Sequence, residues 1–277
     1  MPVPARVNCA KARNTLNAVK IKRLNALSNQ ITVMGMVLSA MPINDYDRRV
    51  VILTREKGKI SAFARGARKP NSALLACSQP FSFGNFTILE GRSSYNLLSA
   101  EISNYFTELR EDLDLVSYGM YFCEFADYFG REGMEAKEFL KLLYQSLRAL
   151  CVKSIPNKLI RYIFEIRMMS VNGEAPQVFG CVKCNGEIQA DKSYLFSERQ
   201  GGLFCDLCKK HAVGGFMISP AAIYTMQYII AAPIEKLYTF RVSDEVLNEL
   251  EQIIKRYLPL YVDKQFQSLK MLEAFPI

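Results

Sequence analysis

The sequence is poor in the residues on which most catalytic sites depend. It has a single histidine, His211, among 277 residues, which leaves little material for a catalytic triad or a proton relay. It also contains no G-x-x-x-x-G-K-[ST] phosphate loop, no G-x-G-x-x-G dinucleotide motif and no G-x-S-x-G nucleophile turn. We therefore expect no enzymatic activity, with an unrecognised hydrolase or nuclease as the alternative.

Long apolar runs are missing as well. No stretch approaches the roughly 18–20 apolar residues that a membrane-spanning helix needs, and we expect a cytoplasmic protein. Four of the eight cysteines show no spacing pattern and are expected to be buried thiols in a reducing compartment. These are Cys9, Cys77, Cys123 and Cys151.

Acidic residues are absent from the first 30 residues, which hold six basic side chains. Residues 31–105 add nine basic and five acidic side chains, and the rest of the chain is slightly acidic although the whole carries a formal charge of +8. A polyanion is therefore expected to bind within the first hundred residues. We expect residues 1–29 to be a flexible basic extension. A phosphate-gripping arm, an organelle presequence and a segment added outside the fold are the alternatives.

Between Gln30 and Ile102 the sequence predicts short strands separated by turn signals. Five strands in about seventy residues are too few for a two-sheet sandwich and predict a small closed barrel of the OB type, with an SH3-like barrel as the alternative. We assign this barrel to residues 30–105 as a DNA-binding domain. The expected strands are residues 31–38, 49–54, 60–64, 81–89 and 95–102.

From Arg110 onward the apolar residues recur at three- and four-residue steps, which predicts helices. The acids Glu111, Asp112 and Asp114 lie where the first helix should begin and are expected to stabilise its dipole. A metal-binding or nuclease carboxylate cluster is the alternative. The fold class is thus α+β, with a helical domain over residues 106–277. Further helices are expected at residues 139–150, 159–171, 219–231 and 243–257, and in a last stretch ending at residue 275.

Two Cys-x-x-Cys pairs lie twenty residues apart, at Cys181 and Cys184 and at Cys205 and Cys208. This spacing is typical of a zinc ion held by four thiolates, which leaves no open position for water and indicates a structural metal. Two short strands between the pairs are expected to form a hairpin that brings them together. The zinc segment covers residues 178–212 and is expected to hold one Zn²⁺ per chain. Disulfides, ordinary core cysteines and His211 as a substitute ligand are the alternatives.

Basic side chains cluster on the second expected strand, the following hairpin and the end of the third strand. They are candidate DNA-binding residues, whose contacts with phosphates would depend on salt and be largely indifferent to sequence. Phe63, Phe83, Phe86 and Tyr95 could stack on bases, although a core position is expected for any one of them. The basic candidates are Arg48, Arg49, Arg55, Lys57, Lys59, Arg65, Arg68 and Lys69.

Residues 35–72 fit a pattern of D-x-x-R, T-x-x-x-G-K and A-x-G-A-R-[RK], each following a strand, and residues 196–208 read FSERQGGLFCDLC. With the LREDLD opening of the helical part, these motifs resemble the bacterial recombination and repair protein RecO family over residues 30–277. Residues 1–29 depart from the family pattern, so no family role extends to them. The motif positions are Asp45, Arg48, Thr54, Gly58, Lys59, Ala64, Gly66, Ala67, Arg68 and Lys69.

The resemblance implies a non-enzymatic mediator of the RecF pathway. Such proteins bind single- and double-stranded DNA, anneal complementary strands and act with RecR to help load RecA onto DNA coated by single-strand-binding protein. They also bind the acidic C-terminal tail of that protein through the helical part and work at the nucleoid. A non-catalytic protein–protein adaptor with a structural zinc and incidental DNA binding is the alternative.

Overall fold

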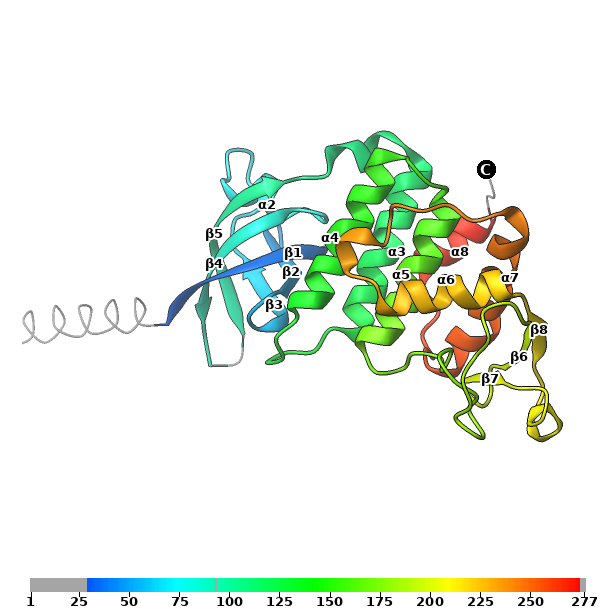
Figure 1. Cartoon of the computed structure of the whole chain (residues 1–277). Helices are drawn as coiled ribbons and strands as arrows, with labels where there is room; N and C mark the ends of the chain where they lie inside the picture. Colours follow the sequence, from blue (N-terminus) through cyan, green and yellow to red (C-terminus); the bar gives the residue numbers. More distant parts are fainter. Residues whose placement is uncertain (1–28, 93, 275–277) are drawn as a thin grey trace, which may run out of the picture.

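The computed structural model describes residues 29–92 and 94–274. Figure 1 shows a β-barrel at one end of the molecule, helices in the middle and a small three-stranded sheet at the opposite end. The basic extension expected over residues 1–29 falls almost wholly outside the described residues.

The barrel is a closed sheet of five strands in the order β1-β2-β3-β5-β4, with β4 pairing back to β1. Among the described residues of the barrel, the only parallel pairing joins β3 to β5. This arrangement confirms the expected OB-type barrel. The first strand is longer than expected, and a bulge between Val37 and Ser39 bends it so that one strand can serve two partners. The strands are β1 (Gln30–Ile43), β2 (Asp47–Thr54), β3 (Gly58–Ala64), β4 (Phe83–Glu90) and β5 (Tyr95–Asn104).

Side chains at alternate positions of these strands point inward and fill the barrel. In β3, for example, Ile60 and Ala62 are fully buried, while Phe63 is exposed, as expected when successive side chains point to opposite faces. A one-turn helix that the sequence did not predict, α2 (Leu74–Cys77), adds Leu74 and Cys77 to this core.

The helical body contains six α-helices among the described residues. None of them is long and apolar enough to cross a membrane. Asp112, Ser219 and Ser243 are the N-caps of three of these helices, and each accepts backbone N–H bonds, as such residues usually do. The last helix begins only at Gln267, after an irregular stretch. The helices are α3 (Leu113–Phe129), α4 (Lys137–Val152), α5 (Asn157–Val171), α6 (Pro220–Ala231), α7 (Asp244–Tyr257) and α8 (Gln267–Ala274).

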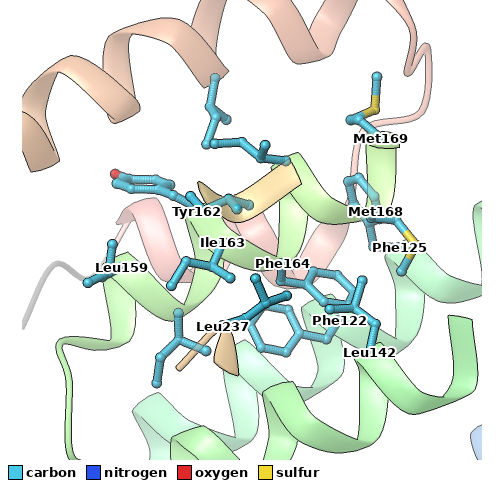
Figure 2. Close-up of a cluster of buried hydrophobic side chains, with 14 of the residues drawn as sticks. Phe122, Phe125, Leu142, Leu159, Tyr162, Ile163, Phe164, Met168, Met169 and Leu237 are labelled. Atoms are coloured by element: carbon cyan, nitrogen blue, oxygen red, sulfur yellow. The ribbon is translucent and has the colours of Figure 1, made fainter. Parts of the chain in front are cut away.

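Aromatic and aliphatic side chains form the core of the body, as Figure 2 shows for residues of α3, α4 and α5. Phe122 of α3 stacks on Phe164 of α5, with ring centroids 4.3 Å apart. Within this core Glu165 is buried and accepts hydrogen bonds from Tyr121 and Arg161. Burial raises the pKa of Glu165, and the adjacent Arg161 guanidinium opposes that rise.

The barrel and the body share one apolar core at their junction. Met36, Leu38 and Leu53 of the barrel are buried among the side chains of the helices. The β2–β3 hairpin also bonds to the chain between α3 and α4, since Lys59 N–H donates to Arg131 O (3.1 Å) and Ala136 N–H donates to Arg55 O (2.9 Å). These contacts fix one end of the barrel against the body.

Candidate nucleic-acid interface and metal centre

The four paired cysteines come together at the far end of the molecule. Their Sγ atoms all lie within 4.8 Å of one another. Strands β6 (Tyr194–Ser197) and β7 (Gly202–Phe204) form the expected hairpin, and the second pair follows β7 directly. A third strand, β8 (Phe216–Ile218), pairs with β6. It was not predicted, because three residues are too few to show an alternation of apolar and polar side chains.

Local hydrogen bonds shape each cysteine pair into a tight turn. Asn185 N–H donates to Cys181 O (2.8 Å), and Cys208 N–H donates to Cys205 O (2.9 Å). Asn185 has a φ of 56°, a left-handed conformation that asparagine tolerates better than most residues. In addition, Cys205 N–H points at the Sγ of Cys181 (3.5 Å), which favours a negatively charged sulfur there.

The donor set fits a metal ion rather than disulfides. The Sγ atoms of Cys184 and Cys205 are 3.8 Å apart, far longer than the roughly 2.05 Å of a disulfide bond. His211 lies exposed on the short 3-10 helix η2 (Lys209–His211) and does not belong to the cluster. Four sulfurs at this separation can hold one metal ion and fill a tetrahedral shell.

The eight basic candidates of the barrel divide by what their side chains contact. Two of them hold the fold together. Arg48 donates to Leu75 O (2.9 Å) and Ser78 Oγ (2.8 Å), which attaches α2 to the barrel. Lys59 reaches the body, where its Nζ lies 2.6 Å from Asp127 O and 3.2 Å from Asp127 Oδ1.

Two further candidates are paired with acids on the barrel. Arg55 forms an ion pair with the adjacent Glu56 (2.8 Å), and Lys57 with Glu90 (2.9 Å). Lys57 also lies 5.9 Å from the ring centroid of Tyr95. Burial, together with nearby carboxylates, raises the pKa of Tyr95 to about 12, so this tyrosine stays neutral. Because Glu56 and Glu90 pair with them, the positive charges of Arg55 and Lys57 are partly neutralised.

The remaining four candidates, Arg49, Arg65, Arg68 and Lys69, are exposed; we call them the cationic face. Among the described residues, no carboxylate lies within ion-pair distance of any of the four. Their charge is therefore available to a ligand.

Backbone contacts give the cationic face its shape. The turn after β3 folds against the β1–β2 turn, because Arg68 N–H donates to Tyr46 O (2.9 Å) and Gly66 N–H donates to Asp47 Oδ1 (2.7 Å). Gly66 has a φ of 68°, which glycine adopts without strain. The two turns and the adjoining ends of β2 and β3 thus form one continuous surface.

The four aromatic candidates also divide into residues that are buried or packed and one that is exposed. Phe86 and Tyr95 are buried in the barrel. Phe83 packs against Tyr144 of α4, with ring centroids 4.5 Å apart. Phe63 is 37% exposed beside the cationic face. Tyr46 also lies here and was not predicted from the sequence. Its ring centroid lies 5.6 Å from Lys69 Nζ, and the residue is 54% exposed. An exposed aromatic residue within a turn could have indicated it.

The acids at the start of α3 have structural partners. Asp112 accepts from the N–H groups of Asp114 and Leu115 and forms an ion pair with Lys153 (3.0 Å). Asp114 accepts from Asn157 Nδ2 (2.9 Å). Helix capping and an ion pair therefore account for Asp112, and the hydrogen bond from Asn157 accounts for Asp114, as expected near a helix N-terminus. Glu111 is exposed at the end of the preceding 3-10 helix, η1 (Thr107–Glu111).

Two family models match the chain. The model described as Recombination protein O N terminal matches residues 28–106, and the model described as Recombination protein O C terminal matches residues 110–270. The first match contains the barrel, and the second contains helices α3 to α7 together with the cysteine cluster.

Curated relatives match over most of their length. A protein of Acetivibrio thermocellus named DNA repair protein RecO is 31% identical over 247 residues, which is 89% of this chain and 97% of that protein. Proteins of the same name from Alkaliphilus metalliredigens and Clostridium acetobutylicum are each 32% identical, over 87% and 86% of this chain and 98% and 95% of their own lengths.

Proposed function

The chain belongs to the recombination protein O family, and on this premise we propose that it is a non-enzymatic DNA mediator which works through the cationic face of its barrel. A role in DNA repair and recombination follows from the family itself. The proposal adds that the protein binds single- and double-stranded DNA, anneals complementary strands and acts with RecR to load RecA onto DNA coated by single-strand-binding protein.

The four exposed cations of the barrel support this proposal most directly. Within the described residues, Arg49, Arg65, Arg68 and Lys69 are exposed and have no carboxylate within ion-pair distance. They lie on an OB barrel, a fold whose outer face on strands 2 and 3 commonly binds oligonucleotides. Contacts between cations and phosphates form with single- and double-stranded DNA of any sequence, and they weaken as the salt concentration rises. Cations that hold two backbones near one another reduce the repulsion between them, so that base pairing can proceed without further chemistry.

The remaining parts of the chain take supporting roles in this proposal. Residues 30–105 form the DNA-binding domain, and residues 106–277 form a helical domain that carries the metal segment 178–212. The cysteine cluster holds one structural Zn²⁺, because four thiolates leave no open coordination position. Residues 1–29 are a basic extension without an assigned role. The helical domain binds the acidic tail of single-strand-binding protein, and the protein works in the bacterial cytoplasm at the nucleoid.

The test is the annealing of two complementary oligonucleotides, measured over about 50–200 mM salt. The wild type should accelerate annealing, and the acceleration should fade as salt rises. The triple variant R65E/R68E/K69E should lose it. A matched control, K210E/K236E/K270E, changes the net charge equally at exposed positions of the helical and metal-binding parts and should retain the activity.

Other outcomes would overturn parts of the proposal. If R65E/R68E/K69E kept DNA affinity but lost binding to a protein partner, the adaptor interpretation would replace DNA binding at the barrel. Cleavage of labelled DNA in the presence of Mg²⁺ or Mn²⁺ would contradict the non-enzymatic role. Intact DNA under those conditions supports it.

A further inference from the structure

A row of three side chains crosses the outer surface of the barrel beside the cationic face. In the strand register, Met41 of β1 lies opposite Arg49 of β2, and Arg49 lies opposite Phe63 of β3. Residues opposite one another on a sheet have neighbouring side chains. Met41 is 64% exposed and Phe63 is 37% exposed, so an apolar side chain flanks the arginine on each side.

The opposite end of the same face is covered. Further along the strands, Leu53 and Lys59 also lie opposite one another, but Leu53 is fully buried in the core of the body and Lys59 binds Asp127. The helices therefore cover one end of this face and leave the end with Phe63 open. A ligand that covered the Phe63 ring and the Met41 thioether, one on each side of Arg49, would remove this apolar surface from water.

The row is also held in place. Arg49 Nε donates to Ser61 Oγ (2.7 Å), which holds the guanidinium against β3 on the outer surface of the sheet. Phe63 is fixed in a strand whose neighbours on both sides are paired, since it lies opposite Arg49 and, in parallel, opposite Asn96. The pairing fixes the backbone from which the Phe63 ring projects, and both an aromatic ring and a guanidinium are flat surfaces on which a nucleobase can stack.

The turns around the row add charge for a phosphate backbone. Residues 44–46 join β1 to β2 and include Tyr46, over which Lys69 lies. Arg65 directly follows the end of β3, two residues after Phe63, and Arg68 lies three residues further along the turn. The row is thus at the place where an OB barrel commonly takes a single strand, on strands 2 and 3 next to the loop between strands 1 and 2.

We propose that Met41, Arg49 and Phe63 form a stacking platform for unpaired bases, which makes this barrel prefer single-stranded over double-stranded DNA. The inference rests on the proposed function, because it presumes that DNA binds at the cationic face. Cations alone bind a duplex and a single strand through the same phosphates. A base within a duplex is already stacked on both faces, so only an unpaired base can cover the Phe63 ring.

The chain contains no tryptophan, so a Phe63→Trp variant places a single fluorescent reporter on the platform. In the full-length protein, a single-stranded oligonucleotide should quench this fluorescence through stacking. A duplex of the same length, or a single strand with abasic sites, should bind with much less quenching. Equal quenching by the duplex, or none by the single strand despite binding, would overturn the proposal.

A second experiment measures the DNA affinities of three substitutions of Phe63 and of one control substitution. Phe63→Ala should weaken single-strand binding roughly 5- to 150-fold and leave duplex binding within about twofold. Phe63→Tyr should keep the wild-type preference because it retains the ring, whereas Phe63→Leu should lose most of it. Tyr224→Ala removes another exposed aromatic, on α6, and should change neither affinity.

The failures of the two proposals are distinguishable. If the wild type binds no DNA, the proposed function fails and the platform fails with it. If the wild type binds DNA but Phe63→Ala lowers both affinities equally or neither, only the platform is wrong. Loss of a protein partner by Phe63→Ala, with both DNA affinities intact, would assign the platform to an apolar side chain of that partner.

Discussion

The cysteine cluster and the cationic face are both built by a strand hairpin and the turn that follows it, yet the chain uses them in opposite ways. Cys181 is fully buried and Cys208 nearly so, whereas Cys205 is half-buried and Cys184 is exposed. Neighbouring side chains such as Leu203 belong to the core of the helical body. Arg65 and Lys69 are exposed and have no acidic partner among the described residues. The first group is arranged to stabilise the fold, and the second is free to bind.

The largest effect is expected at the cysteines. Cys181→Ser should reduce the metal content below one ion per chain and lower the free energy of unfolding by several kcal/mol, because structural zinc contributes about 10–16 kcal/mol in isolated fingers. Metal analysis and denaturant unfolding check this, with Cys151→Ser, outside the cluster, as the control. DNA affinity of the folded fraction should change little. A metal-free wild type with full stability would contradict the zinc assignment.

The converse effect is expected at the cationic face. R65E/R68E/K69E should weaken single-strand binding roughly tenfold or more at low salt, and each lost contact should reduce the salt slope by about 0.7. The unfolding midpoint should stay within about 2–3 °C of the wild type. These exposed side chains form no ion pair within the described structure, and Arg68 donates to Asn44 O (3.1 Å) at an exposed turn. An unchanged salt slope would show that other groups bind the phosphates.

A comparison of two lysines tests whether burial or charge decides the role of a cation. Lys59→Met removes the contact with Asp127 and should lower the free energy of unfolding by about 1–2 kcal/mol with little effect on DNA affinity. Lys69→Met should do the reverse. Equal losses of DNA affinity in the two variants would mean that Lys59 also contacts DNA.

The smallest effect concerns the start of α3, away from both clusters. Its ion pair with Lys153 and its capping hydrogen bonds hold the pKa of Asp112 below the usual 3.8. This contribution to stability should be present above pH 3.8 and be lost as the pH falls through the lower folded-state pKa. Asp112→Ala should cost about 1 kcal/mol at neutral pH and flatten the acid limb of the stability profile. An unchanged acid limb would exclude this contribution.

Much of the fold could be predicted from the sequence because its signals are local. Alternation located the five barrel strands to within a few residues, apart from the long β1, and the spacing of the cysteine pairs indicated their cluster. The bulge in β1, the short helix α2 and the strand β8 were missed because each spans too few residues to show a period.

The division among the cations and aromatics could not be predicted. Phe63 and Phe83 are both phenylalanines in strands of one barrel, and only the position of α4 covers the second. Lys59 and Lys69 differ because Asp127, far away in the sequence, lies beside the first. Such contacts depend on how the helices pack against the barrel, which no local pattern records.

The most direct test of the account measures DNA affinity and stability together for R65E/R68E/K69E and Cys181→Ser. The account predicts a crossed result, in which the first variant loses single-strand binding but keeps its unfolding midpoint, and the second loses stability and metal but keeps the affinity of its folded fraction. Wild-type affinity in R65E/R68E/K69E would contradict the central claim that the cationic face binds DNA.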